Sequence, residues 1–241
     1  MSANLAAVTA SPAPSRPTLI RLPGCYPVQA DTWLLADTLR ELDLASGADV
    51  LDLCTGTGAL AVAAGLEGAA SVTAVDISLR SAANAWLNSR RHGVTARVLR
   101  GDLFEALLPG QQFDVVLSNP PYVPGHSDRL PRHTVSRCWD AGVDGRRLLD
   151  RICAGAADRL RPGGSLLLVQ SAVADHARSV RRLRRQGLDV AVVRRERVPF
   201  GPVMRARAEL IRARGLGLGE QDVEELVVIR ASRASEQEAS A

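Results

Sequence analysis

The sequence contains no lysine and few aromatic residues, and both shortages bear on its function. All 30 basic residues are arginine, and the formal net charge is only +4. Dedicated nucleic-acid surfaces usually carry a larger basic excess, so charge alone does not favour a polyanion as partner. Aromatic residues make up 3% of the chain, which leaves few rings on which a target base could stack.

The spacing of the cysteines argues against a metal-binding protein, and the length of the apolar runs argues against a membrane protein. Cys25, Cys54, Cys138 and Cys153 form no C-x-x-C pair, and no histidine stands at metal-ligand spacing. We therefore expect no metal site and predict reduced thiols in a cytoplasm. No apolar run reaches membrane-spanning length, and the N-terminus lacks a basic region followed by an apolar core, so we expect no signal peptide and no membrane partner.

Short apolar runs alternate with amphipathic segments over most of the 241 residues. This alternation predicts an α/β fold, a Rossmann-like seven-stranded, mostly parallel sheet with helices on both faces. The expected strands are 50–53, 72–75, 96–99, 113–118, 165–169, 188–193 and 223–229. The expected helices are 30–44, 59–66, 78–92, 148–160 and 173–186.

The remaining segments predict the domain organisation. Residues 1–17 should be a disordered lead, and 18–48 a cover that begins with an edge strand at 18–22. The main domain should span 49–230, followed by a disordered tail over 231–241. Two stretches fit the alternation poorly: 123–143, which we expect to be a lid or substrate-binding loop, and the arginine-rich 199–219, which we expect to be a projecting arm or a solvated insertion.

The tetrapeptide Asn119-Pro120-Pro121-Tyr122 ends the strand expected at 113–118. Open α/β sheets bind ligands at the carboxyl ends of their strands. There the Asn119 side chain brings an acceptor oxygen beside backbone carbonyls whose direction the prolines constrain. Two such acceptors can hold the hydrogens of a planar –NH2 group and leave its lone pair free to attack. An ordinary strand-ending turn is the alternative.

Three acidic groups precede this turn at the ends of successive expected strands. The first belongs to Asp52-Leu53-Cys54-Thr55-Gly56-Thr57-Gly58, where small residues let the backbone approach a ligand. The sequence does not match the dinucleotide-binding G-x-G-x-x-G. Asp76 follows the second strand, where a carboxylate can bind a ribose diol, and Asp102 follows the third. Each alone could be a helix cap, but together they indicate a bound adenosine compound.

This succession resembles the class I S-adenosylmethionine-dependent methyltransferases, and its Asn-Pro-Pro-Tyr turn resembles the type that methylates amide or exocyclic amine nitrogens. Two further stretches narrow the resemblance to the release-factor glutamine methyltransferases, the HemK family, in the short branch that lacks the N-terminal helical domain. They are Tyr-Pro-Val-Gln-Ala-Asp-Thr-Trp-Leu-Leu at 26–35 and Trp-Asp-Ala-Gly-Val-Asp-Gly-Arg at 139–146.

The resemblance implies S-adenosyl-L-methionine as cofactor and a set of site residues. Asn119 and the Pro120 carbonyl would hold the substrate –NH2, and Tyr122 would pack against its planar group. Asp52 would orient the glycine turn or receive the methionine amino group. The implied cofactor-binding residues are Tyr26, Thr32, Asp52, Thr55, Gly56, Gly58, Asp76, Ile77, Asp102, Leu103 and Asn119. Cys54 stands where the family commonly has glycine, at a position we expect not to contact the cofactor.

We therefore expect an N-methyltransferase that acts on a glutamine side chain of a protein such as a translation release factor. Members of the short branch often work with a small zinc-binding activator protein, so such a partner is implied too. An RNA or DNA methyltransferase acting on a base amine, a small-molecule N-methyltransferase and a non-catalytic cofactor-binding module are the alternatives. Arg178, Arg181, Arg182, Arg184 and Arg185 predict a cationic helix face, solvated or in contact with RNA.

Overall fold

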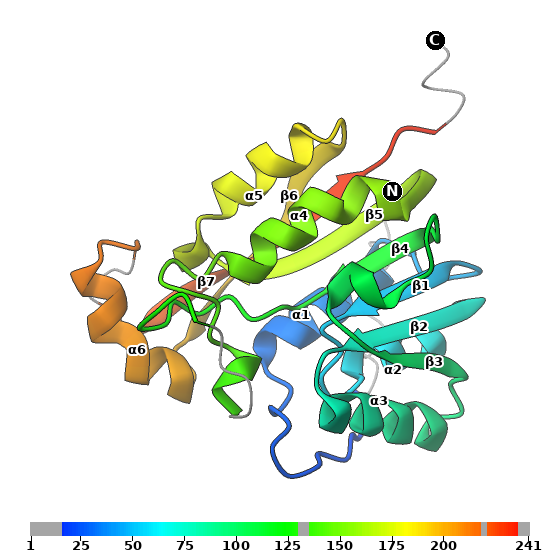
Figure 1. Cartoon of the computed structure of the whole chain (residues 1–241), viewed down its shortest axis with the longest axis horizontal. Helices are drawn as coiled ribbons and strands as arrows, with labels where there is room; N and C mark the ends of the chain where they lie inside the picture. Colours follow the sequence, from blue (N-terminus) through cyan, green and yellow to red (C-terminus); the bar gives the residue numbers. More distant parts are fainter. Residues whose placement is uncertain (1–15, 130–134, 218–220, 236–241) are drawn as a thin grey trace, which may run out of the picture.

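A computed structural model describes residues 16–129, 135–217 and 221–235 (Figure 1). Most of the lead expected at 1–17, and the last six residues of the tail expected at 231–241, lie outside these ranges. The described part of that tail begins in the sheet, because the last strand continues to Ser232. The expectation of a disordered tail from residue 231 is therefore wrong at its first two residues.

The centre of the fold is a seven-stranded sheet in the order β3-β2-β1-β4-β5-β7-β6. Every pairing is parallel except those of β7, which runs antiparallel to both β5 and β6. The strands are β1 Asp49–Leu53, β2 Ser71–Asp76, β3 Ala96–Arg100, β4 Phe113–Ser118, β5 Leu160–Ser171, β6 Asp189–Pro199 and β7 Val223–Ser232. This confirms the predicted fold class.

Helices cover both faces of the sheet. The α-helices are α1 Ala30–Glu41, α2 Ala59–Leu66, α3 Leu79–Arg91, α4 Arg147–Arg159, α5 His176–Arg184 and α6 Pro202–Ala213. Short 3-10 turns occupy Leu103–Ala106, Val135–Cys138 and Ala172–Ala174. Figure 1 shows α4 and α5 on one side of the sheet and α1, α2 and α3 on the other. Among the described residues, no helix is long and apolar enough to cross a membrane.

The core explains why the central strands read as unbroken apolar runs. Strands covered on both faces need apolar side chains pointing in both directions. In β4, residues 115–118 are all buried, and in β5 the run 165–171 is buried throughout. These buried runs therefore have no solvent-facing positions that would make polar and apolar residues alternate.

The edge strand expected at 18–22 is not formed. Its main chain instead binds side chains of α3, because Asn88 Oδ1 accepts from Ile20 N at 2.9 Å and Asn84 Oδ1 accepts from Leu22 N at 2.9 Å. The Nδ2 groups of both asparagines donate to the Ile20 carbonyl oxygen at 2.8 Å. Two buried amides thus replace a strand partner and tie the residues before α1 across the site.

The segment 199–219 was expected to be a projecting arm or a solvated insertion, and its described residues are solvated on one face and packed on the other. It forms α6, whose Met204, Ala208 and Ile211 are buried at helical spacing. Arg207 binds Asp140 at 3.0 Å from this helix. The arginines on its other positions obscured this apolar stripe. The stretch is therefore a packed element, and it lies against the loop that follows the Asn-Pro-Pro-Tyr turn.

The arginine face of α5 is largely paired within the protein. Arg178 binds Asp144 and Asp150 at 3.3 and 2.5 Å. Arg181 binds Asp175 at 3.5 Å, and Arg182 also reaches Asp150 at 3.7 Å. These ion pairs lower the positive charge that the sequence suggested for this surface.

Candidate active site

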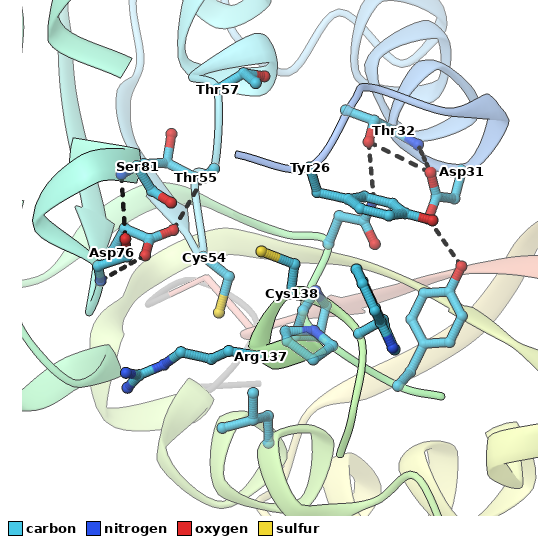
Figure 2. A pocket seen from close by; sticks show the side chains of 18 of the residues that line it. Tyr26, Asp31, Thr32, Cys54, Thr55, Thr57, Asp76, Ser81, Arg137 and Cys138 are labelled. Carbon is cyan, nitrogen blue, oxygen red and sulfur yellow. Dashed lines mark hydrogen bonds between the residues drawn. The ribbon is translucent and has the colours of Figure 1, made fainter. Parts of the chain in front are cut away.

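A cavity lies at the carboxyl ends of β1, β2, β3 and β4 (Figure 2). Residues 26–32 cover it from one side, and the 3-10 turn at 135–138 covers it from another. The cavity is lined by every predicted site residue except Asp52 and Gly58. Those in its lining are Tyr26, Thr32, Thr55, Gly56, Asp76, Ile77, Asp102, Leu103, Asn119, Pro120 and Tyr122.

Asp76 fixes the glycine turn that borders the cavity. One carboxylate oxygen accepts from Gly56 N at 3.0 Å, and the other accepts from Ser78 N at 2.8 Å. Burial raises the pKa of Asp76 above its ordinary value, and the two backbone bonds oppose that change. Gly56 has φ +55°, and a Cβ added there would meet no heavy atom closer than 3.9 Å. The glycine therefore provides a left-handed turn with free space beside it.

Asp52 and Gly58 lie beneath this turn instead of in the cavity. Asp52 is fully buried and accepts from Thr55 Oγ1 at 2.6 Å and from Ala61 N at 3.1 Å. Burial raises the pKa of Asp52 to about 7. Of its two implied roles, this geometry supports orienting the loop. A Cβ on Gly58 would approach Ala85 Cα to 2.7 Å, so this glycine permits the close contact with α3, and its cofactor-binding role stays a prediction.

Cys54 lines the cavity, contrary to the expectation that it makes no contact there. Its φ of +61° is left-handed, which explains why glycine suits the position. Cys138 enters the cavity from the 3-10 turn, and Figure 2 shows both sulfur atoms there. Burial raises the pKa of Cys54 well above its ordinary value and that of Cys138 to about 11, so both thiols stay protonated near neutral pH.

The far end of the cavity holds Asp102, Ile77 and Leu103. Asp102 binds Arg151 of α4 at 3.0 Å, and both side chains are more than one-third exposed. An exposed ion pair contributes at most about 1 kcal/mol, so a ligand with a hydrogen-bond donor could compete for this carboxylate. Ile77 is 39% exposed, which leaves an apolar surface for a flat ring.

The Asn119 side chain is held by Thr32 at the opposite end. Its Nδ2 donates to Thr32 Oγ1 at 2.9 Å. Asp31 Oδ1 in turn accepts from the backbone nitrogen of Thr32 at 2.7 Å. Among the described residues, the Asn119 amide oxygen has no such bond. The amide is therefore oriented, and its acceptor atom remains available beside the Pro120 carbonyl.

Tyr122 packs into the same end of the cavity. It is 8% exposed, and its hydroxyl donates to Asp31 Oδ2 at 2.8 Å. Burial and the nearby Asp31 carboxylate raise the pKa of Tyr122 well above its ordinary value. The ring is thus a fixed, neutral wall beside Asn119.

Several lining residues were not predicted as site residues. Asp31 lines the cavity and belongs to the 26–35 segment, but the sequence did not single it out. Trp139 packs against Tyr26, with ring centroids 5.4 Å apart. Arg137 extends into the cavity in Figure 2 and lowers the pKa of Asp76. Met204 and Glu224 come from α6 and β7, far along the chain, and only the tertiary fold brings them to the site.

The known sequences to which this chain is similar are methyltransferases. The family model described as "Methyltransferase small domain" matches residues 21–136. A Methanocaldococcus jannaschii protein named as a candidate protein N5-glutamine methyltransferase is 31% identical over 182 residues, which cover 76% of this chain and 90% of that protein. The release factor glutamine methyltransferase of Bordetella pertussis is 39% identical over 163 residues, which cover 65% of this chain and 59% of that protein. The corresponding Gloeobacter violaceus enzyme is 44% identical over 132 residues, covering 51% of this chain and 46% of that protein. This chain thus spans about half the length of these two bacterial relatives.

Solved structures share the fold. A structure of the E. cuniculi Mtq2–Trm112 complex, described as responsible for methylation of the termination factor eRF1, has a TM-score of 0.59 and 22% identity, covering 88% of this chain and 99% of that one. The T. thermophilus 16S rRNA N2 G1207 methyltransferase in complex with AdoMet and guanosine has a TM-score of 0.55 and 23% identity, covering 88% of this chain and 46% of that one. At these identities the likeness establishes the class I methyltransferase architecture.

Proposed function

Because this chain belongs to the HemK-like family of protein N5-glutamine methyltransferases, which are class I S-adenosylmethionine-dependent enzymes, we propose that it methylates the side-chain amide nitrogen of a glutamine in a translation release factor. The observation that carries the proposal is the orientation of the Asn119 side-chain amide by a hydrogen bond. Thr32 holds its nitrogen and leaves its oxygen available in a cavity that also contains the Gly56 turn.

The chemistry of the lining fits the cofactor. The free space beside Gly56 can accept the methionine part, and Asp76 retains lone pairs for ribose hydroxyls because each of its carboxylate oxygens accepts one backbone hydrogen bond. Ile77 and Asp102 offer an apolar surface and an acceptor for the adenine ring and its amine. When bound, S-adenosylmethionine supplies a methyl group that is already activated by the positive charge on sulfur.

The protein's task is then to orient a poor nucleophile. A carboxamide nitrogen shares its lone pair with the carbonyl group, so alignment with the methyl carbon matters greatly. Asn119 Oδ1 and the Pro120 carbonyl accept the two N–H hydrogens and stabilise positive charge that develops on nitrogen. Tyr122 supports the flat amide from the side. Asn119 is not a base, and we expect the proton to leave late, to water or to a backbone acceptor.

Methyl transfer to separate acceptors tests the proposal. The protein is incubated with radiolabelled S-adenosylmethionine and, in separate reactions, release factor, RNA, DNA or a small-amine mixture. We expect label in the release factor, at a glutamine identified by mass spectrometry. Asn119→Ala should abolish transfer while cofactor affinity, measured by calorimetry, stays near that of the wild type. Label in RNA or DNA, and none in release factor, would refute the assignment.

The partner requirement is a separate proposal. We propose that a small zinc-binding activator protein assists this chain, because the resemblance implies one and the E. cuniculi structure is a complex of Mtq2 with a second protein, Trm112. Full activity of the purified chain alone would contradict this part and leave the rest of the proposal intact.

A further inference from the structure

Glu224 is a buried acidic residue in the cavity lining, and it has no role in the reaction proposed above. It lies near the start of β7 and is 7% exposed. Glu224 lines the same cavity as Asn119 and Tyr122, and its buried Oε2 has no hydrogen-bond partner among the described residues. A buried polar oxygen without a partner lowers the stability of the folded state.

The surroundings do not compensate the charge. The titratable neighbours of Glu224 are Asp31, Tyr26 and Tyr122. The Glu224 charge contributes to the raised pKa values of both tyrosines, and the Asp31 charge contributes to the raised pKa of Glu224. Burial raises the pKa of Glu224 to about 7, and the nearby Asp31 adds to the increase while Ser171 opposes it. Tyr26 and Tyr122 remain protonated across neutral pH because both pKa values are raised. This end of the cavity therefore favours a ligand that donates hydrogen bonds.

The donor must be distinct from the group that is methylated. Asn119 Oδ1 and the Pro120 carbonyl accept both hydrogens of the target –NH2 in the proposed function. A glutamine side chain has no other N–H group. An acceptor that is part of a polypeptide, however, carries main-chain N–H groups at the glutamine and at its neighbours, and these can reach a second acceptor on the cavity wall.

We propose that Glu224 is a positioning residue for the methyl acceptor, whose carboxyl group accepts a hydrogen bond from a main-chain N–H of the acceptor polypeptide. The inference rests on the proposed function. It assigns the acceptor end of the cavity to polypeptide recognition and gives the last strand of the sheet a part in substrate selection.

Glu224→Gln tests the role, and Glu225→Gln is the matched control. The Glu225 side chain is 36% exposed and binds Arg195 at 2.7 Å, and it is not part of the cavity lining. In Glu224→Gln we expect KM for the release factor to rise about tenfold, because a neutral amide oxygen replaces the charged acceptor and weakens the hydrogen bond. The Kd for S-adenosylmethionine should stay unchanged, and Glu225→Gln should match the wild type in both constants.

Two further readouts separate positioning from a structural role. The wild-type KM for the release factor should fall as the pH rises through about 7, where Glu224 ionises, and the KM of Glu224→Gln should lack this step. Glu224→Gln should also unfold at a higher temperature than the wild type at pH 8, because it removes a buried unpaired carboxylate. Higher stability combined with weaker acceptor binding is the expected pattern.

The failures are distinguishable. If the wild type labels the release factor and Glu224→Gln has the same KM and pH profile as Glu225→Gln, the inference is overturned and the proposed function stands. If the wild type labels no polypeptide, the proposed function and this inference both fall.

Discussion

Replacing Thr32 by valine should slow methyl transfer without disturbing the fold. Valine keeps the shape of threonine but removes the oxygen that accepts from Asn119 Nδ2 at 2.9 Å. The Asn119 amide would then be free to rotate away from the orientation in which its oxygen meets the substrate. Loss of one such hydrogen bond costs about 1 kcal/mol, which corresponds to a roughly fivefold smaller population of the productive orientation.

Misplacement of the nucleophile can enlarge this effect to about 100-fold, because alignment controls the rate. We therefore expect kcat for release-factor methylation to fall about 5- to 100-fold in Thr32→Val, measured at saturating cofactor and acceptor. Thr32→Ser retains the hydroxyl and should recover most of the activity.

Thr38 provides the matched control. It lies on the same helix, is 3% exposed, and its hydroxyl donates to the Leu34 carbonyl at 2.7 Å without touching the site. Thr38→Val should lower the unfolding temperature slightly and leave kcat unchanged. If Thr32→Val has the same kcat as Thr38→Val, then Thr32 does not orient Asn119 for catalysis and the reasoning fails.

Three other changes test the cofactor side of the cavity. Asp76→Ala should raise the Kd for S-adenosylmethionine at least about tenfold in calorimetry, because charge-assisted bonds to the Gly56 turn are lost together with the proposed ribose acceptor; an unchanged Kd would contradict this role. Cys54→Gly should raise stability by up to about 1 kcal/mol, since it relieves a left-handed φ, and a lower unfolding temperature would argue against strain there. The pKa of Asp52 is about 7, against an ordinary 3.8, so the folded state binds the Asp52 proton more tightly than the unfolded state does. The stability that this proton contributes is present at low pH and is lost as the pH rises from about 4 to 7. Asp52→Asn should therefore flatten the fall in unfolding temperature between pH 5 and 8, whereas a profile parallel to that of the wild type would contradict the shift.

The sequence predicted those parts of the structure that depend on local patterns. Apolar runs placed the first four strands to within one residue, since buried parallel strands need them, whereas β5 begins five residues earlier and β6 ends six residues later than predicted. The strand-end positions of Asp76, Asp102 and Asn119 followed directly, because parallel strands bring their carboxyl ends to one edge. The cavity lining confirms that these three residues share it.

What the sequence did not predict depends on contacts between distant segments. Asparagine side chains of α3 form hydrogen bonds with the main chain of residues 18–22, and no local sequence pattern distinguishes that arrangement from an edge strand. Glu224 reaches the cavity only because β7 enters the sheet between β5 and β6. The sequence also did not predict that Asp52 is buried beneath the turn, since a carboxylate before a glycine turn can face either the ligand or the loop.

The central position of β7 has a consequence for biosynthesis. β5 and β6 leave the ribosome first, yet each pairs with β7 and not with the other. Until β7 emerges, both strands expose unpaired edges, and α6 lacks the strand that follows it. Arg214, just after α6, donates to the carbonyl oxygens of Gly125 and Val143 at 2.7 and 2.6 Å, so the loop after Asn-Pro-Pro-Tyr is anchored by a segment made late. A nascent chain can thus complete its acceptor pocket only after α6 and β7 have been synthesised and β7 has paired with β5 and β6.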